Sequence, residues 1–282
     1  MVRNLAQWPL VPELPEVESA RLVIEREALH RPIVDVDDTD TYVCRPHQPG
    51  EIRTALVGRR LVTVHRQGKS MWCLTSGTGR SRRPGPALGI HLGMSGRMVT
   101  GDARGHEVDG GDYWRRGRAA GDHRFTRFRL GFGDGGYLLL VDPRRLGRVR
   151  LDPPVDVLGP DAREITPAAF RAVMARGSTA VKARLLDQEA LAGVGNLLAD
   201  QALWQAKIDP SRPVGALSPR EIDRLLRALR GAIEAAIAGG GVHTLSVIAA
   251  RTAGGHCPRC GTPMRRATVG GRTTWWCPRE QT

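Results

Sequence analysis

The sequence predicts an α+β protein, with an N-terminal β-sandwich and a flanking helix followed by a helical domain and a C-terminal β-hairpin. Three observations carry this prediction. Short apolar runs separated by Gly, Asp and Pro dominate residues 33–141, which is typical of strands. Longer runs with helical periodicity follow residue 166. Three of the five cysteines lie between residues 257 and 277, which favours a metal site over disulfides.

Composition restricts the class of partner. The 282-residue chain has a formal charge of +13 and a pI near 10.7. Such a charge indicates a polyanionic partner, nucleic acid by default, although a basic surface kept for solubility is the alternative. The sequence contains no run of 18 apolar residues, so no membrane-spanning helix is predicted. Met1–Val11 has no apolar core of the kind a secretory signal needs, so we expect a cytoplasmic protein.

A helix is predicted to begin at Pro15. Proline suits the first helical position, and Glu16 and Glu18 would lie at the positive end of the helix dipole. One face should be buried, because apolar residues recur at helical spacing, at Val17, Ala20, Ile24 and Ala28. The helix explains these residues without any function, but it does not explain the preceding doublet Pro12-Glu13.

The first half should form a β-sandwich. Its strands are predicted at Ile33–Val36, Leu61–Val64, Met71–Leu74, Leu88–His91, Phe125–Phe132 and Tyr137–Val141. Asp134-Gly135-Gly136 predicts a hairpin turn between the last two. Ser76–Pro86 and Thr100–Asp122 are rich in Gly and Arg without an apolar period, which predicts exposed, mobile loops.

The stiff segment from Asp152-Pro153-Pro154 to Pro160 is the predicted domain boundary. It divides residues 12–152 from a helical domain at 153–250, and residues 251–282 form the hairpin. Thr166-Pro167 predicts the start of a helix that runs to about Arg176 and stops at Gly177. Ser218-Pro219-Arg220-Glu221 is a capping box, and the helix after it should end at Gly239–Gly241.

Between these helices, Lys182–Leu191 and Leu197–Ala206 are predicted as two helices joined by the tight turn Gly193-Val194-Gly195-Asn196. The turn alone indicates only a helix end and a helix start. The backbone N–H groups at such a helix N-terminus also make a good seat for an anion.

Several motifs together resemble those of the formamidopyrimidine-DNA glycosylase/endonuclease VIII family of base-excision repair enzymes. The strongest matches occur in the family's order, at Pro12–Glu18, His91–Gly96, Asp142–Gly147 and Lys182–Asn196. The last of these resembles the family's helix–two-turn–helix. The resemblance covers almost the whole chain from Pro12 onward.

The resemblance implies a bacterial, nucleoid-associated monomer that acts on double-stranded DNA containing damaged bases or abasic sites. It implies a glycosylase with associated AP-lyase activity, in which the Pro12 secondary amine attacks C1′ and forms a Schiff base. Glu13 would donate a proton to open the sugar, and Glu16 would support the site electrostatically. Lys69 and Arg272 would serve successive eliminations at the two phosphates.

The resemblance also implies a DNA-binding set. Met94 would fill the gap left by the extruded nucleotide, Arg144 would pair with the orphaned base, and Asn196 and Lys182 would hold backbone phosphates. Leu146 stands where the family usually has Phe. It can wedge but cannot stack, and base–aromatic stacking is worth roughly 1–3 kcal/mol.

The C-terminal motifs Cys257-Pro258-Arg259-Cys260 and Cys277-Pro278-Arg279-Glu280 have sixteen residues between them, as in a zinc ribbon. The family has Cys at the last position, where this chain has Glu280. We expect one Zn²⁺ bound by Cys257, Cys260 and Cys277, with Glu280 or water as the fourth ligand. His256 is a weaker candidate, and packing of Trp275 and Trp276 alone is the alternative to a metal.

Two further departures from the family bear on activity. Only fifteen residues, none of them aromatic, separate Gly241 from Cys257. The corresponding region is longer in formamidopyrimidine-type members and covers the flipped purine, so broader or oxidised-pyrimidine substrates are expected.

The second departure is that eleven residues precede Pro12. A proline amine is nucleophilic only as a free terminus. We therefore expect residues 1–11 to be upstream translated sequence or a processed leader, with Val11 as an internal GUG start.

Two other functions remain open from the sequence. One is a catalytically inactive relative that binds damaged or abasic DNA without cutting it. The other is a zinc-ribbon RNA-binding protein with no role in repair.

Overall fold

A computed structural model describes residues 12–79, 83–111, 123–175 and 177–282. The chain folds as two compact units. The first holds Pro12 and Glu16–Val155, and the second holds Glu13–Pro15 and Asp156–Thr282. The division after Val155 falls within the proline-rich segment that ends at Pro160. In the described residues, no helix combines the length and apolar character needed to cross a membrane.

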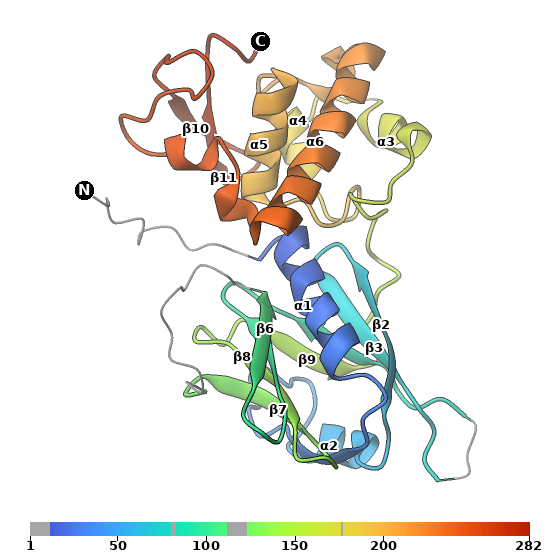
Figure 1. Ribbon diagram of the computed structural model, residues 1–282. Helices are drawn as coiled ribbons and strands as arrows, with labels where there is room; N and C mark the ends of the chain where they lie inside the picture. The colour runs from blue at the N-terminus through green and yellow to red at the C-terminus, as the bar shows by residue number, and fades with distance from the viewer. Residues whose placement is uncertain (1–11, 80–82, 112–122, 176) are drawn as a thin grey trace. The chain divides into compact units, whose positions relative to one another are not determined.

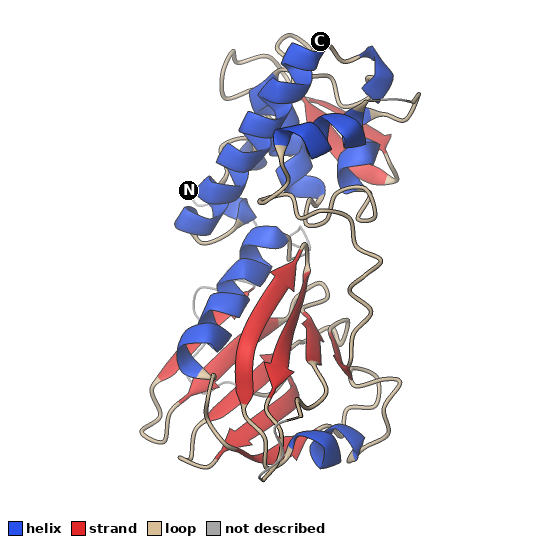
Figure 2. Ribbon diagram, turned by 90° about the vertical axis from the view of Figure 1, so that its right-hand side faces the viewer, coloured by secondary structure: helices blue, strands red, loops and turns tan. Residues whose placement is uncertain are grey.

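The first unit contains two antiparallel sheets (Figures 1 and 2). One has the strand order β1-β7-β8-β5-β6, and the other has the order β2-β3-β4-β9. Their bounds are β1 Ile33–Asp37, β2 Leu61–Gln67, β3 Ser70–Thr75, β4 Leu88–His91, β5 Arg97–Gly101, β6 Glu107–Gly111, β7 Thr126–Phe132, β8 Tyr137–Val141 and β9 Arg148–Leu151. Apolar side chains from both sheets form one buried cluster. The predicted strands are therefore present, and a β-sandwich with a flanking helix is confirmed.

Helix α1 (Leu14–Glu27) supplies the flanking helix. Its apolar stripe is buried as predicted, with Val17, Ala20, Ile24 and Ala28 all at most 1% exposed. These side chains belong to the same cluster as the strands, so the helix is held by packing onto the sandwich (Figure 2). The short helix α2 (Glu51–Leu56), which was not predicted, buries Ile52 and Leu56 in that cluster.

The prediction of a loop over Thr100–Asp122 is wrong in its first part. β5 and β6 pair along their whole length, from Arg97 opposite Gly111 to Gly101 opposite Glu107. β6 reads Glu-Val-Asp-Gly-Gly, which lacks apolar alternation, so its strand conformation comes from pairing with β5 rather than from local propensity. Residues 112–122 and 80–82 of the two predicted loops lie outside the described residues.

The second unit is helical and ends in a hairpin (Figure 1). Its helices are α3 Pro167–Met174, α4 Val181–Leu186, α5 Asn196–Ala206 and α6 Pro219–Gly239, with short 3₁₀ turns η1 Val214–Ala216, η2 Val242–Thr244 and η3 Ile248–Ala250. The capping box before α6 is confirmed, because Ser218 and Glu221 bond each other's backbone N–H groups. Gly240 ends α6 in the left-handed conformation.

The hairpin pairs β10 (Arg265–Val269) with β11 (Arg272–Trp276). Gly270 and Gly271 both have positive φ, 59° and 70°, as a tight two-residue hairpin turn requires. A Cβ on Gly270 would lie 3.0 Å from the Cα of Ala183, so the hairpin turn packs directly against α4.

The helix predicted over Lys182–Leu191 is shorter than expected, because α4 ends at Leu186. Asp187 terminates it, since its side chain accepts the N–H of Glu189 at 3.1 Å and its carbonyl accepts the N–H groups of Ala190 and Leu191. Aspartate favours such turns over continued helix because its carboxylate competes for backbone N–H groups. Two turns, rather than a longer helix and one turn, therefore join α4 to α5.

Candidate functional site

Glu13 is fixed at the N-terminus of α5. Its Oε1 accepts the backbone N–H of Leu197 at 2.8 Å, and its Oε2 accepts those of Gly195 and Leu198 at 3.0 Å each. The residue is 2% exposed. The carboxylate thus takes up N–H groups that have no partner inside the helix, and its charge lies at the positive end of the helix dipole.

The turn before α5 is shaped to admit this side chain. A Cβ on Gly195 would lie 2.2 Å from Cδ of Glu13, so no larger residue fits there without moving the carboxylate. Gly193 has a φ of +107°, and its carbonyl accepts the N–H of Leu14. Gln188 ties the turn together, since its amide donates to the carbonyls of Leu186 and Val194 and accepts the N–H of Gly193.

A buried charge cluster lies behind this turn. Lys182 Nζ is 2.6 Å from Oδ1 of Asp200, and Arg251 Nε donates to Oδ2 of Asp200 at 2.8 Å. The three side chains are at most 5% exposed. Burial lowers the pKa of Lys182, while the adjacent Asp200 carboxylate opposes this shift. No local sequence motif marks Asp200 or Arg251, which are 18 and 69 residues from Lys182 along the chain.

The same cluster fastens the hairpin to the helices. The carbonyl of Thr273 accepts from Asn196 Nδ2 at 3.1 Å and from Lys182 Nζ and an Arg251 terminal nitrogen at 3.3 Å. Lys182 Nζ also donates to Oγ1 of Thr274 at 2.8 Å. Lys182 is completely buried, so the structure places its ammonium on protein partners instead of at the surface, where a phosphate contact was expected. Asn196 is half-buried, and Arg272 beside Thr273 is exposed.

In the first unit, one buried carboxylate joins two loops that were predicted separately. Asp142 Oδ1 accepts the hydroxyl of Ser95 at 2.7 Å and the N–H of Arg144 at 3.1 Å, and Oδ2 accepts the N–H of Gly147 at 2.7 Å. A Cβ on Gly93 would lie 2.3 Å from the carbonyl carbon of Leu146. The structure therefore brings together the loops that carry Met94 and Arg144.

Lys69 lies in the turn between β2 and β3, whose next residue, Ser70, pairs with His91. Burial, and then the charge of Lys69, lowers the pKa of His91, which favours a neutral imidazole. Its Nδ1 accepts the N–H of Gly93 at 3.0 Å, so the ring also orders the loop before Met94.

The acids of α1 have different environments. Glu16 is 5% exposed. Glu18 bonds both Arg21 and Arg66, at 3.0 and 2.9 Å. Burial alone would raise the pKa of Glu18, but the hydrogen bonds and charges of these two arginines lower it. Glu18 is therefore a structural anchor between α1 and β2.

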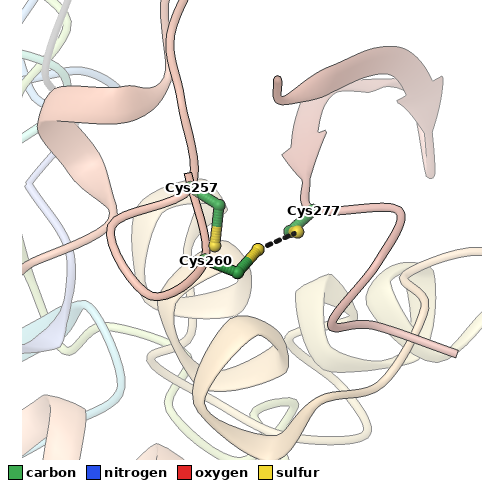
Figure 3. Close-up of side chains that lie close together, drawn as sticks. All are labelled: Cys257, Cys260 and Cys277. Atoms are coloured by element: carbon green, nitrogen blue, oxygen red, sulfur yellow. Dashed lines mark hydrogen bonds between the residues drawn. The ribbon is translucent and has the colours of Figure 1, made fainter. Parts of the chain in front are cut away.

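The three C-terminal cysteines converge (Figure 3). Their sulfurs all lie within 4.8 Å of one another, and the Cys260 and Cys277 sulfurs are 3.5 Å apart. Zinc–thiolate bonds of about 2.3 Å in a tetrahedron place sulfurs about 3.8 Å apart, so the cluster fits a zinc ion. Trp204 Nε1 lies 3.3 Å from the Cys257 sulfur. The pKa of Cys260 is lowered to about 7, first by its hydrogen bond with Thr262, whereas burial raises the pKa of Cys277 to about 11.

Glu280 does not belong to the group of converging ligand atoms. Its carboxylate pairs with Lys207 at 3.0 Å and with Arg259 at 3.3 Å, and these contacts lower its pKa. The neighbouring Gln281 instead supports the cluster, since its Oε1 accepts the N–H of Cys277 and its amide donates to Ile208.

Comparison with known proteins identifies the family. The profile of the formamidopyrimidine-DNA glycosylase N-terminal domain matches residues 11–149, and that of the formamidopyrimidine-DNA glycosylase H2TH domain matches residues 158–246. The chain belongs to the formamidopyrimidine-DNA glycosylase family. The family, the α+β fold with a helix–two-turn–helix, and the assignment to base-excision repair glycosylases with AP-lyase activity are thus confirmed.

The relatives extend over the whole chain. A formamidopyrimidine-DNA glycosylase of Streptomyces avermitilis is 33% identical over 300 aligned residues, which cover 96% of this chain and 98% of the relative. One of Chloroflexus aggregans is 31% identical over 290, covering 95% and 98%. The structure of Lactococcus lactis Fpg in complex with abasic-site DNA has the same fold, with a TM-score of 0.76 at 24% identity over 96% of this chain and 99% of that one.

Proposed function

We propose that this glycosylase excises damaged bases from duplex DNA and cleaves the resulting abasic site by covalent catalysis at Pro12. The observation that carries the proposal is the environment of Glu13. This carboxylate, next to Pro12 in the sequence, accepts hydrogen bonds from three backbone N–H groups. It packs against Gly195 so closely that a side chain at that position would displace it. Such preorganisation is typical of catalytic groups.

In the proposed reaction the neutral secondary amine of Pro12 attacks C1′ and the damaged base departs with the electron pair of the glycosidic bond. The sugar ring then opens, and the amine nitrogen loses its proton as the C1′–N bond becomes an iminium. The ring oxygen O4′ gains a proton. Borohydride reduces such an iminium to a stable amine, which gives the reaction a direct signature.

We propose that Glu13 carries this proton. Three N–H donors and the helix dipole favour its ionised form. It would therefore first accept the proton released by the Pro12 nitrogen and then deliver it to O4′. Glu16, buried in the first turn of α1, would add negative charge that stabilises the iminium. Lys69 and Arg272 would contact the phosphates at which the two eliminations occur.

We assign phosphate binding to Asn196 and a positioning role to Lys182. Asn196 shares the Thr273 carbonyl with Lys182 and Arg251, so the buried charges fix the turn and the hairpin strand relative to each other. Arg272 is the residue before that carbonyl. Phosphate contacts of this kind set the register of a protein on DNA.

The joined loops of the first unit suit the gap left by a flipped nucleotide. Met94 and Leu146 would enter the stack as apolar wedges, and Arg144 would meet the orphaned base. Asp142 holds both loops through its two oxygens, so insertion of either wedge would not require loop rearrangement.

We further propose that Cys257, Cys260 and Cys277 hold Zn²⁺, which would cross-link the loop after η3 to the end of β11. The fourth ligand would be water or Glu280. For Glu280 to bind, its carboxylate must turn from Lys207 and Arg259, and this exchange of ion pairs favours water in the resting site.

The short segment after α6 supports a preference for lesions other than 8-oxoguanine. Residues 242–250 contain two 3₁₀ turns, and Val242, Leu245 and Val247 of this segment are buried. Arg251, which follows, is bound to Asp200. This leaves little chain to cover a flipped purine. We propose abasic sites and oxidised pyrimidines as the better substrates.

The test uses a chain that begins at Pro12 and duplex DNA with a single abasic site. Borohydride trapping and strand cleavage are expected. Tight binding without either would identify an inactive relative, and stronger competition by structured RNA than by abasic duplex would identify an RNA-binding protein instead.

A further inference from the structure

An exposed tyrosine in the first unit is surrounded by arginines. Tyr42 is 44% exposed. The guanidinium carbon of Arg45 lies 4.1 Å from its ring centroid, that of Arg148 lies 5.0 Å away, and that of Arg145 lies 5.8 Å away. We call these four residues the Tyr42 patch.

The patch has a built geometry. Asp40 Oδ1 accepts the N–H groups of Tyr42 and Val43 at 3.1 Å each, which orients the segment that carries the ring. The same carboxylate binds Arg145 through two hydrogen bonds of 3.0 and 2.8 Å. Val43 is completely buried, and its carbonyl accepts the N–H of Val149. The patch is therefore anchored to β9 and to the loop before it.

The patch is continuous with the loop that, under the proposed function, meets the orphaned base. Arg145 lies within Asp142–Gly147, beside Arg144, and Arg148 begins β9 directly after that loop. Arg145 holds a φ of +54° and its side chain is bound to Asp40, although it is exposed like Arg144. We therefore expect Arg145 to act as part of the patch and Arg144 to meet the orphaned base.

The chemistry of the patch favours a phosphate over a base. The tyrosine ring already has guanidinium groups against it, so its faces are less available for base stacking. Three guanidiniums surround one ring, and of these three Arg145 is the one bound to Asp40. Crowding like charges is unfavourable unless an anion joins them. Arginine binds phosphate oxygens through paired N–H groups, and cation–π contact with Tyr42 would hold the side chains ready for this.

We propose that the Tyr42 patch binds backbone phosphates of the strand opposite the lesion. The inference rests on the proposed function. Phosphate binding by the patch would compensate in part for Leu146, which cannot stack, by adding contacts to the strand whose base is left unpaired.

The test compares Arg45→Gln and the double variant Arg45→Gln/Arg148→Gln with Arg220→Gln, an exposed arginine at the start of α6 in the other unit. Affinity for abasic-analogue duplex is measured over a range of salt. Each lost phosphate contact should reduce the slope of log K against log salt by about 0.9, so the double variant should lose about 1.8. Arg220→Gln should leave the slope unchanged.

Methylphosphonate linkages, which lack the phosphate charge, then identify the strand. Placed opposite the lesion, they should abolish the difference between the chain and its double variant, whereas in the lesion strand they should preserve it. An unchanged slope would overturn the proposal and leave the patch a structural cluster. The reverse strand pattern would assign it to the lesion strand. All variants are made in a chain that begins at Pro12, and failure of that parent chain to trap abasic DNA would instead refute the proposed function.

Discussion

Replacing Gly195 with alanine should disable catalysis by displacing one side chain. The added Cβ would lie 2.2 Å from Cδ and 2.5 Å from Oε1 of Glu13. The backbone itself would tolerate alanine, because Gly195 has a φ of −115° and a ψ of −168° in the extended region. The effect therefore isolates the position of the Glu13 carboxylate from any loss of glycine's conformational freedom.

The magnitude follows from what the displaced carboxylate loses. Overpacking of a buried site costs about 1–3 kcal/mol. Each hydrogen bond to a charged group contributes about 1.5–3 kcal/mol, and three converge on this side chain. A displacement of about 1 Å at a catalytic group lowers the rate about 100-fold. We expect Gly195→Ala to trap abasic DNA about 100-fold more slowly and to unfold at lower urea concentration.

Gly231→Ala is the matched control, because an added Cβ there meets nothing within 4 Å and Gly231 lies in the interior of α6. It should leave trapping unchanged and stabilise the chain by about 1 kcal/mol. Single-turnover borohydride trapping at saturating DNA is the assay. Trapping by Gly195→Ala at the unaltered rate would refute the role that we assign to Glu13.

Three further predictions follow from other parts of the molecule. Lys182→Met should destabilise the chain by about 3–5 kcal/mol, because it leaves the buried Asp200 carboxylate with one cation fewer. Lys207→Met, which removes an exposed ion pair, should cost under about 1 kcal/mol. Urea unfolding followed by tryptophan fluorescence compares the two variants. Glu280→Cys should raise the affinity for zinc, measured in competition with a chromophoric chelator. Glu280→Gln should leave the zinc affinity unchanged if water is the fourth ligand. A lower zinc affinity of Glu280→Gln would identify the carboxylate as the ligand. Nicking of duplexes carrying single lesions should be slow for 8-oxoguanine and faster for oxidised pyrimidines, and efficient 8-oxoguanine cleavage opposite cytosine would contradict the argument from the short segment after α6.

Local chemistry made part of this structure predictable. The capping box at Ser218 and the left-handed Gly240 determine the ends of α6 within a few residues, and the apolar period of α1 identifies its buried face. Such features depend on neighbours in the chain. For the same reason the strands with alternating apolar residues were predicted, and β6, which depends on pairing with β5, was not.

The candidate site was predictable only at the level of motifs. The Gly-x-Gly-Asn turn indicated an anion seat, but the structure fills it with Glu13, a residue 182 positions away from Gly195. Lys182 was expected at a phosphate because the resemblance to the family implies that role. Its burial depends on Asp200 and Arg251, which come from other elements and which no local pattern marks. Long-range pairing of charges is a tertiary property.

The central claim is that the Pro12 nitrogen is the nucleophile. A proline nitrogen acylated by a preceding residue is an amide whose lone pair is delocalised, whereas a terminal proline has a free secondary amine. The direct measurement is borohydride trapping on abasic duplex, followed by mass spectrometry of the cross-linked peptide, for a chain that begins at Pro12 and for one in which residues 1–11 are retained. We predict efficient trapping with the sugar attached at Pro12 in the first and none in the second. Equal trapping by the longer chain, or attachment at Lys69, would contradict the account.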